Sequence, residues 1–316
     1  MATPSPRASL WLRRVLVFNL VVEVLIVVTG GLVRLTGSGL GCPSWPHCVP
    51  GSFVPVAHQA QGFHKYIEFG NRTLTGVVSI AVVAVIVGLW FWAPTRRRLL
   101  RPAFLVLAGV AAQAVIGGIT VRTGLNPAIV AGHFLVSMLL VATSAWLLER
   151  YDEGDGPPRT LVRPEIRGLA ALASVLAAVI LVLGTLVTGS GPHSGDAQEP
   201  ARLGLDPRSM SWLHADAVML FVGLVVAVLL AVKVTDAGAR PLRAWLLVLA
   251  VTLGQGVVGY VQYFTGLPWP VVLVHMLGAS LLVVSLVHGV LSLRVREPVP
   301  LTAPVAHAPD TAEAPA

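Results

Sequence analysis

The chain has 316 residues, of which 55% are hydrophobic and only 12% are charged, and its formal net charge is +7. Soluble globular domains usually carry about 25% charged residues, so this composition excludes an ordinary soluble enzyme. The positive charge does not indicate a nucleic-acid partner either, because the arginines lie in short clusters between long apolar runs.

Apolar runs bounded by charged residues, proline or glycine predict eight membrane-spanning helices. Each run has roughly 20 residues, enough to cross a hydrocarbon core of about 30 Å. In chain order, the expected spans are 14–34, 69–92, 103–122, 128–148, 168–188, 210–232, 244–264 and 270–293. The first run has no small-residue cleavage site after it, so we interpret it as a retained helix rather than a signal peptide.

The basic residues predict which helix ends face the cytoplasm. If the N-terminal segment, residues 1–13, is cytoplasmic, 16 of the 22 Lys and Arg residues fall on the cytoplasmic side. The positive-inside rule then places both termini in the cytoplasm and the chain in the cell membrane. Residues 149–167 become a cytoplasmic linker, and residues 35–68 become an outer loop. The Pro- and Ala-rich stretch 294–316 is expected to be a disordered tail.

An internal repeat divides the chain into two halves. Three features recur at an offset of 142 residues, since Gln113, Thr123-Gly-Leu and His133 reappear as Gln255, Thr265-Gly-Leu and His275. We therefore interpret residues 14–148 and 168–293 as two copies of one four-helix unit, both facing the same way because four is even. The predicted fold is an all-α integral membrane protein with two pseudo-symmetric four-helix bundles.

Three histidines are expected inside the membrane at one depth, namely His133, His214 and His275. Ionisable residues are rare inside spans and are usually functional there. A zinc site would need cysteine or carboxylate partners, and none is suitably placed beside these histidines. Haem iron needs only one or two imidazoles from facing helices, with basic groups near its propionates. Basic residues at outer helix ends that suit this role are Arg34, Arg72 and Arg122.

With these residues in hand, the chain resembles the haem A synthase family. The resemblance rests on the run from Thr29 to Cys48, on Glu68-Phe-Gly-Asn-Arg, on both Gln-to-His repeats and on His214. Members of that family oxidise the C8 methyl group of haem O to the formyl group of haem A by successive hydroxylations. The resemblance implies that the C-terminal half binds a haem b cofactor and that the N-terminal half holds the haem O substrate. It also implies functional links to haem O synthase and to cytochrome oxidase assembly.

Carried over to this chain, the family's pattern assigns site residues in both halves. His214 and His275 resemble the axial ligands of haem b, and His133 resembles a ligand of the substrate haem. Glu68 resembles the required catalytic carboxylate, and Arg34 and Arg122 remain candidate propionate partners. The outer-loop pair Cys42 and Cys48 resembles a disulfide, acting as a structural bridge or as a redox-active pair.

The second predicted helix departs from the family's pattern at one position. Where the family commonly has Glu-x-x-His-Arg, this chain has Glu68-Phe-Gly-Asn71-Arg72. An amide is a poor iron ligand, so His133 is expected to ligate the substrate haem alone or with help from His64. We expect the Asn71 carboxamide to bond a water or Glu68.

For two carboxylates, Glu68 and Glu23, the sequence is consistent with two different roles. Glu68 either caps the start of its helix or takes part in the chemistry, by accepting a proton or by placing a water. Glu23 lies in the middle of the first span and is either protonated or bonded to another helix.

The main alternative function is a bis-histidine haem-b electron-transfer protein without a haem substrate. Such a carrier would need an even number of deep histidines, whereas three leave one pair and one incomplete site. A transporter with parallel repeats would have helices broken in mid-membrane, and proline is almost absent within these spans. The expected partners are an unidentified electron donor and a second copy of the chain in a homo-oligomer.

Overall fold

A computed structural model describes residues 6–196, 198 and 200–296. The long helices are α1 (Pro6–Leu35), α2 (His64–Trp92), α3 (Leu100–Arg122), α4 (Pro127–Asp152), α5 (Pro164–Ser190), α6 (Pro207–Val234), α7 (Ala239–Phe264) and α8 (Trp269–Ser292). A short 3-10 helix, η1 (Pro94–Leu99), precedes α3. All eight long helices are apolar enough to cross a membrane, which confirms a multi-span helical membrane protein.

All eight helices begin earlier than the hydropathy pattern predicts, and the difference is largest in α1. Helix α1 begins at Pro6 rather than at residue 14, and α2 begins at His64 rather than at residue 69. The sequence boundaries mark where apolar residues start, but a helix continues through polar residues once its backbone bonds are formed. His64 is therefore helical, and the predicted outer loop ends before it.

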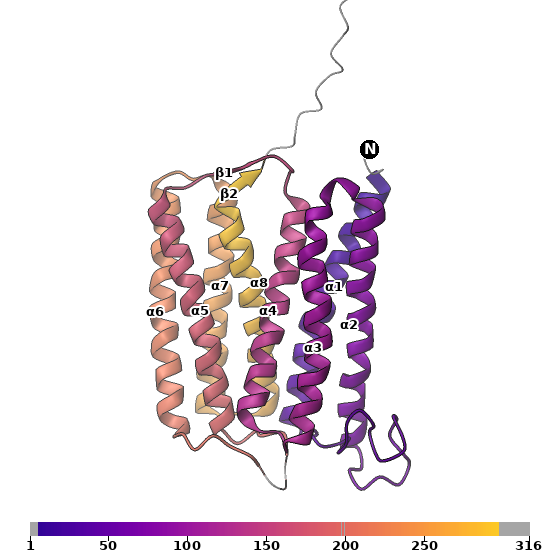
Figure 1. The fold of residues 1–316 in the computed structure, drawn as a ribbon. Coiled ribbons are helices and arrows are strands. Elements are labelled where there is room, and N and C mark those ends of the chain that lie inside the picture. Colours follow the sequence, from indigo (N-terminus) through magenta and orange to yellow (C-terminus); the bar gives the residue numbers. More distant parts are fainter. Residues whose placement is uncertain (1–5, 197, 199, 297–316) are drawn as a thin grey trace, which may run out of the picture.

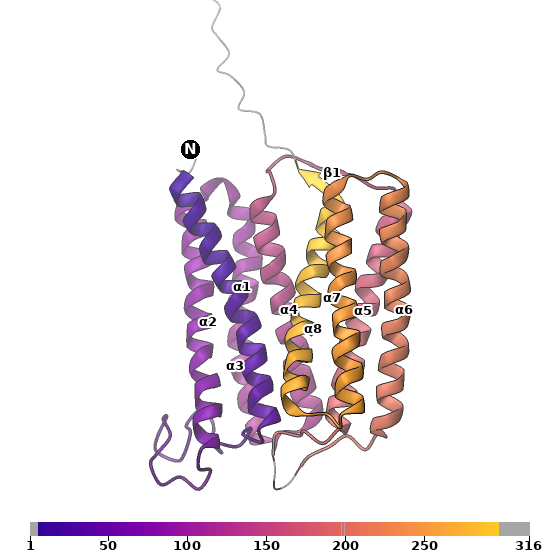
Figure 2. The same cartoon turned by 180° about the vertical axis from the view of Figure 1, so that it is seen from behind.

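The helices form two groups of four that lie side by side, α1–α4 and α5–α8 (Figures 1 and 2). Consecutive helices pack against each other within each group, and the same pairings occur in both. These pairings are consistent with two copies of one unit. The halves meet through α1, α4, α5 and α8. At this interface α1 and α8 approach so closely that a Cβ at Gly31 would lie 2.6 Å from the Met276 sulfur.

Helix starts are set by proline and capping residues. Pro127, Pro164 and Pro207 occupy the first turns of α4, α5 and α6, where the missing N–H costs no hydrogen bond. Just before α6, the Asp206 carboxylate accepts bonds from the hydroxyl and the backbone N–H of Ser209, which lower the pKa of that carboxyl. In α4 and α6 these signals fix how far from the helix start His133 and His214 lie.

The repeated Thr-Gly-Leu forms the tight turn at the end of each half. Gly124 and Gly266 have φ values of 60° and 79°, and the leucines after them, Leu125 and Leu267, both have a φ of 59°. Such positive values are rare for leucine and easy for glycine, so two consecutive left-handed residues reverse the chain between α3 and α4 and between α7 and α8.

The two ends of the bundle differ, as Figure 1 shows. The loop end carries the segment between α1 and α2, and the terminal end carries the N-terminus. At the terminal end, β1 (Pro158–Thr160) pairs antiparallel with β2 (Arg294–Arg296). Buried Glu153 holds this sheet in place, with Arg294 and Arg296 nitrogens 3.3 and 3.6 Å from its carboxylate.

The predicted tail needs a correction at its beginning. Its first residues, 294–296, form β2 because they pair with the linker strand and because Glu153 balances their charge. The rest of that prediction, residues 297–316, lies outside the described residues.

Candidate functional site

His214 and His275 face each other across the C-terminal half. Their ring centroids are 6.4 Å apart and their planes are inclined by 69°. A bond between a metal and an imidazole nitrogen is about 2.0–2.1 Å long, so two imidazoles sharing one metal have centroids roughly 6 to 6.5 Å apart. The observed spacing therefore fits two imidazoles that would hold one haem iron between them.

Each of the three deep histidines presents an unsatisfied polar atom. Within the described part of the chain, the Nδ1 atoms of His133, His214 and His275 are buried and have no hydrogen-bond partner. Buried polar groups are normally bonded, so these rings suit a ligand better than a purely structural role. The described residues also contain no group of three or more His, Cys, Asp or Glu side chains that would hold a bare metal ion. The donor set fits haem iron, which needs only imidazole from the protein.

Two of these histidines are each supported by a glutamine on the preceding helix. The Gln113 side chain on α3 donates from Nε2 to the His133 carbonyl oxygen at 2.8 Å. Gln255 on α7 donates in the same way to the His275 carbonyl, also at 2.8 Å. The sequence repeat thus has a structural meaning, because each glutamine fixes the backbone of the histidine that lies 20 residues later.

Glycines leave room beside the imidazole rings. The pairs are Gly117 with His133, Gly184 with His214, and Gly259 with His275. A Cβ at these glycines would lie 3.3 to 3.6 Å from the Cε1 atom of the facing ring. Each ring therefore packs against a helix backbone rather than against a side chain.

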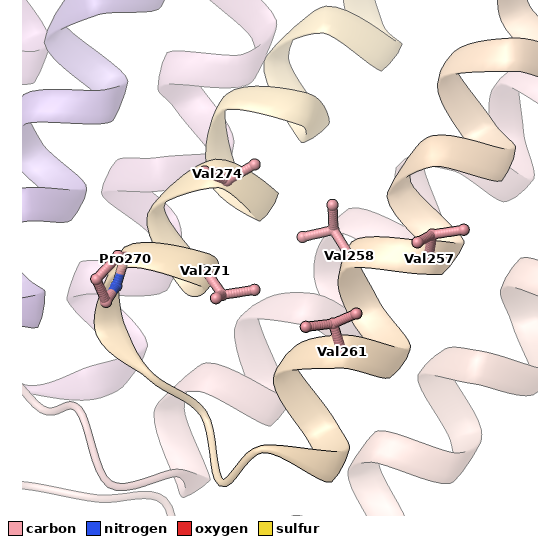
Figure 3. Close-up of a pocket in the computed structure, with 6 residues that line it drawn as sticks. All are labelled: Val257, Val258, Val261, Pro270, Val271 and Val274. Carbon is pink, nitrogen blue, oxygen red and sulfur yellow. The ribbon is translucent and has the colours of Figure 1, made fainter.

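An apolar pocket of about 270 Å³ lies between the loop-end parts of α7 and α8 (Figure 3). Its lining consists of Val257, Val258, Val261, Pro270, Val271 and Val274. Val271 lies one turn before His275, and the side chains of Val258 and Val271 point into the gap between the two helices. The pocket opens to the outer surface of the helices, because Val257, Val261 and Val274 are exposed, and it supplies no polar chemistry of its own.

In the N-terminal half, the structure places Asn71 beside α1. The Thr29 hydroxyl donates to its carboxamide oxygen at 2.7 Å. The sequence predicts a water or Glu68 as the partner of Asn71, and the structure adds a hydroxyl from the neighbouring helix as the partner of its oxygen. The sequence offered no signal for Thr29 beyond its place at the start of the run that resembles the family.

The predicted disulfide between Cys42 and Cys48 is present, and both cysteines are fully buried. Between them, Trp45 lies against α3 so closely that a Cβ at Gly118 would collide with its ring. Arg122 lies over the same ring, 5.6 Å from its centroid, and donates to the Trp45 carbonyl at 3.1 Å. The disulfide loop therefore covers the loop end of the N-terminal half.

Glu68 and Arg72 hold this loop against α2. One Glu68 oxygen accepts the Cys42 backbone N–H at 2.6 Å, and the other accepts two Arg72 nitrogens at 2.6 and 3.0 Å. Arg72 also donates to the carbonyls of Cys42, Ser44 and His47 at 2.8 to 3.2 Å. Both Glu68 oxygens thus have protein partners, which sequence reasoning did not anticipate.

Two other predicted site residues lie at the loop end. His64 begins α2, and its Nδ1 atom is 2.8 Å from the Ser38 hydroxyl. Arg34 donates to the carbonyls of His193 and Thr188 at 2.7 and 2.9 Å, which ties α1 to the end of α5. In the described residues Arg34 pairs with no carboxylate.

Glu23 is buried in the interior of the N-terminal half. One of its oxygens finds no hydrogen-bond partner among the described residues, and no basic side chain there pairs with it. One turn earlier on α1, Asn19 bonds the Ser144 hydroxyl of α4 at 3.1 Å. The hydrogen bond that joins α1 to α4 in this region is therefore made by Asn19.

Comparison with known proteins gives a consistent match. The family model COX15-CtaA, described as cytochrome oxidase assembly protein, matches residues 13–194. A protein of Lysinibacillus sphaericus named Heme A synthase is 28% identical over 272 residues, which cover 82% of this chain and 87% of that protein. Proteins of the same name from Bacillus pumilus and Listeria welshimeri are each 34% identical, over 49% and 41% of their lengths and 48% and 40% of this chain.

Proposed function

The chain belongs to the COX15-CtaA family of cytochrome oxidase assembly proteins, and we propose that it is a haem A synthase. In this role it is an oxidoreductase that converts the C8 methyl group of haem O into a formyl group. The observation that carries the proposal is the pairing of His214 with His275, together with a third imidazole, His133, whose Nδ1 atom is also buried, at the repeated position in the other half. A site with two histidines suits a resident haem, and a site with one histidine suits a haem substrate. A simple electron carrier would not need the site with one histidine.

In the C-terminal half, His214 and His275 would hold haem b. A bound haem b supplies one-electron transfer. The chain's own contribution is to fix the two imidazoles, because Gln255 anchors the His275 backbone and Gly259 lets the ring lie close to α7.

In the N-terminal half, His133 would hold the substrate haem and Glu68 would act on the methyl group. Each of two hydroxylations removes two electrons from the methyl carbon, which an external oxidant accepts, and the resulting geminal diol loses one water to give the formyl group. Glu68 is proposed to accept a proton released in these steps or to orient a water. Its bonds to Arg72 and to the Cys42 amide keep the carboxylate in one position beneath the disulfide loop. Asn71 and Arg72 are the polar neighbours of this site.

The loop end is proposed to face the outside of the cell membrane, with both termini in the cytoplasm. The excess of Lys and Arg at the terminal end supports this orientation. The Cys42–Cys48 disulfide supports it too, because disulfides persist in oxidising compartments. Arg34 and Arg122 at the loop end are the proposed partners of haem propionates. A haem O synthase, an oxidase assembly machinery, an electron donor and a second copy of this chain are the proposed partners.

Expression in cells that make haem O but lack haem A tests the proposal. The chain should produce haem A, identified by mass, and His133→Ala and His275→Ala should abolish it. His58→Ala is the matched control, because this histidine is exposed in the loop between α1 and α2 and should not affect the product. No haem A from the native chain would refute the function, and haem A from His275→Ala would refute the cofactor site.

A further inference from the structure

Asn71 holds in the N-terminal half the place that His214 holds in the C-terminal half. His214 is the seventh residue after the first residue of α6, and Asn71 is the seventh after the first residue of α2. Likewise, His133 and His275 are each the sixth residue after the start of α4 and α8. Because the same helix pairs are in contact in the two halves, the position of α2 relative to α4 corresponds to the position of α6 relative to α8. Asn71 therefore lies on the helix opposite His133, at the same level.

The Asn71 side chain does not replace an imidazole at this level. Its carboxamide oxygen already accepts the Thr29 hydroxyl at 2.7 Å, and its nitrogen lies beside Gly30, where a Cβ would be 3.9 Å away. A carboxamide is a weak metal ligand, and one that is bonded to a neighbouring helix has little freedom to approach an iron atom. The carboxamide lines the site as a polar wall.

The other candidate ligands on α2 are engaged elsewhere. His64 lies seven residues before Asn71, which is about 10 Å nearer the loop end, and it contacts Ser38. Glu68 and Arg72 bind each other and the disulfide loop. Among the described residues of α2, none offers an imidazole opposite His133 at its own level.

We infer that His133 is the single protein ligand of the substrate haem and that the face toward Asn71 binds a small neutral molecule, for which carbon monoxide is the probe. The inference rests on the proposed function and adds to it a ligand class and a difference between the two sites. In the C-terminal half, His214 and His275 would both bind the haem iron and would leave no position for such a ligand. The small-molecule site is therefore confined to the half in which the methyl group is oxidised.

Carbon monoxide binding to the reduced, purified protein that contains both haems tests this inference. We expect one of the two haems to bind carbon monoxide, and the other to keep its low-spin spectrum. Asn71→His should abolish binding and convert the responsive haem to low spin. The reciprocal change, His214→Asn, should make the C-terminal haem bind carbon monoxide as well. His64→Ala should leave the fraction that binds unchanged.

The outcomes separate this inference from the function on which it rests. Haems in the same sample are identified by mass, so a preparation with haem b alone would contradict the proposed function. If haem b and haem O are both present and neither binds carbon monoxide, only the open face is refuted. Binding that persists in Asn71→His, or that doubles in His64→Ala, would also refute it, because a residue other than Asn71 would then control that face.

Discussion

Replacing Glu68 with glutamine should release the loop that the Cys42–Cys48 disulfide closes. The Glu68 side chain is only 7% exposed, and its carboxylate accepts the Cys42 amide and two nitrogens of Arg72. The glutamine NH₂ must face one of these donors, which removes a charge-assisted bond worth about 1.5–3 kcal/mol. Breaking a fully buried ion pair costs about 3–5 kcal/mol. Because Arg72 is 21% exposed and keeps its bonds to backbone carbonyls, we expect a loss of about 2–3 kcal/mol in loop stability.

Thiol labelling during mild reduction measures this loss. If labelling requires the loop to open, the labelling rate of Cys42 and Cys48 should rise about 30- to 160-fold in Glu68→Gln. Glu165→Gln, at the exposed start of α5, is the matched control and should label like the native protein. A native labelling rate in Glu68→Gln, together with loss of haem A, would show that Glu68 acts only in the chemistry and that its contacts do not hold the loop.

Two further predictions follow from contacts at the helices that carry the histidines. Gln255→Leu should cost about 1 kcal/mol of stability and should shift the low-spin spectrum of the C-terminal haem, whereas Gln113→Leu should leave that spectrum unchanged. An unchanged spectrum in Gln255→Leu would show that the carbonyl bond does not position the ligand. Gly118→Val should displace the Trp45 ring and quench or shift its fluorescence, whereas Gly168→Val, which has open space around it, should not. Equal fluorescence in both variants would contradict the close packing of the disulfide loop on α3.

The spans were predictable because a membrane leaves little choice of structure. Every backbone polar group must be bonded within the segment, so long apolar runs become helices. Polar helix ends escaped this reasoning, as the starts of α1 and α2 show, because residues such as His64 carry no apolar signal. The strand at residues 294–296 escaped it for a similar reason, since its pairing depends on a linker more than 130 residues away.

The common level of His214 and His275 was also predictable, because helix rise converts sequence position into depth. That the His214 and His275 rings face each other could be seen only in the structure, because it depends on the orientation of α6 and α8 about their own axes. The partners of Glu68 and Asn71 required the structure too. Cys42 and Thr29 come from other segments, and no periodicity in the sequence connects them to α2.

Mass identification of the haems extracted from the purified native chain tests the central claim most directly. The account predicts haem b together with haem O or haem A, because His214 and His275 would keep one haem while the site at His133 holds a substrate or product. Haem b alone, in a preparation from cells that make haem O, would contradict the claim and would favour a simple electron carrier.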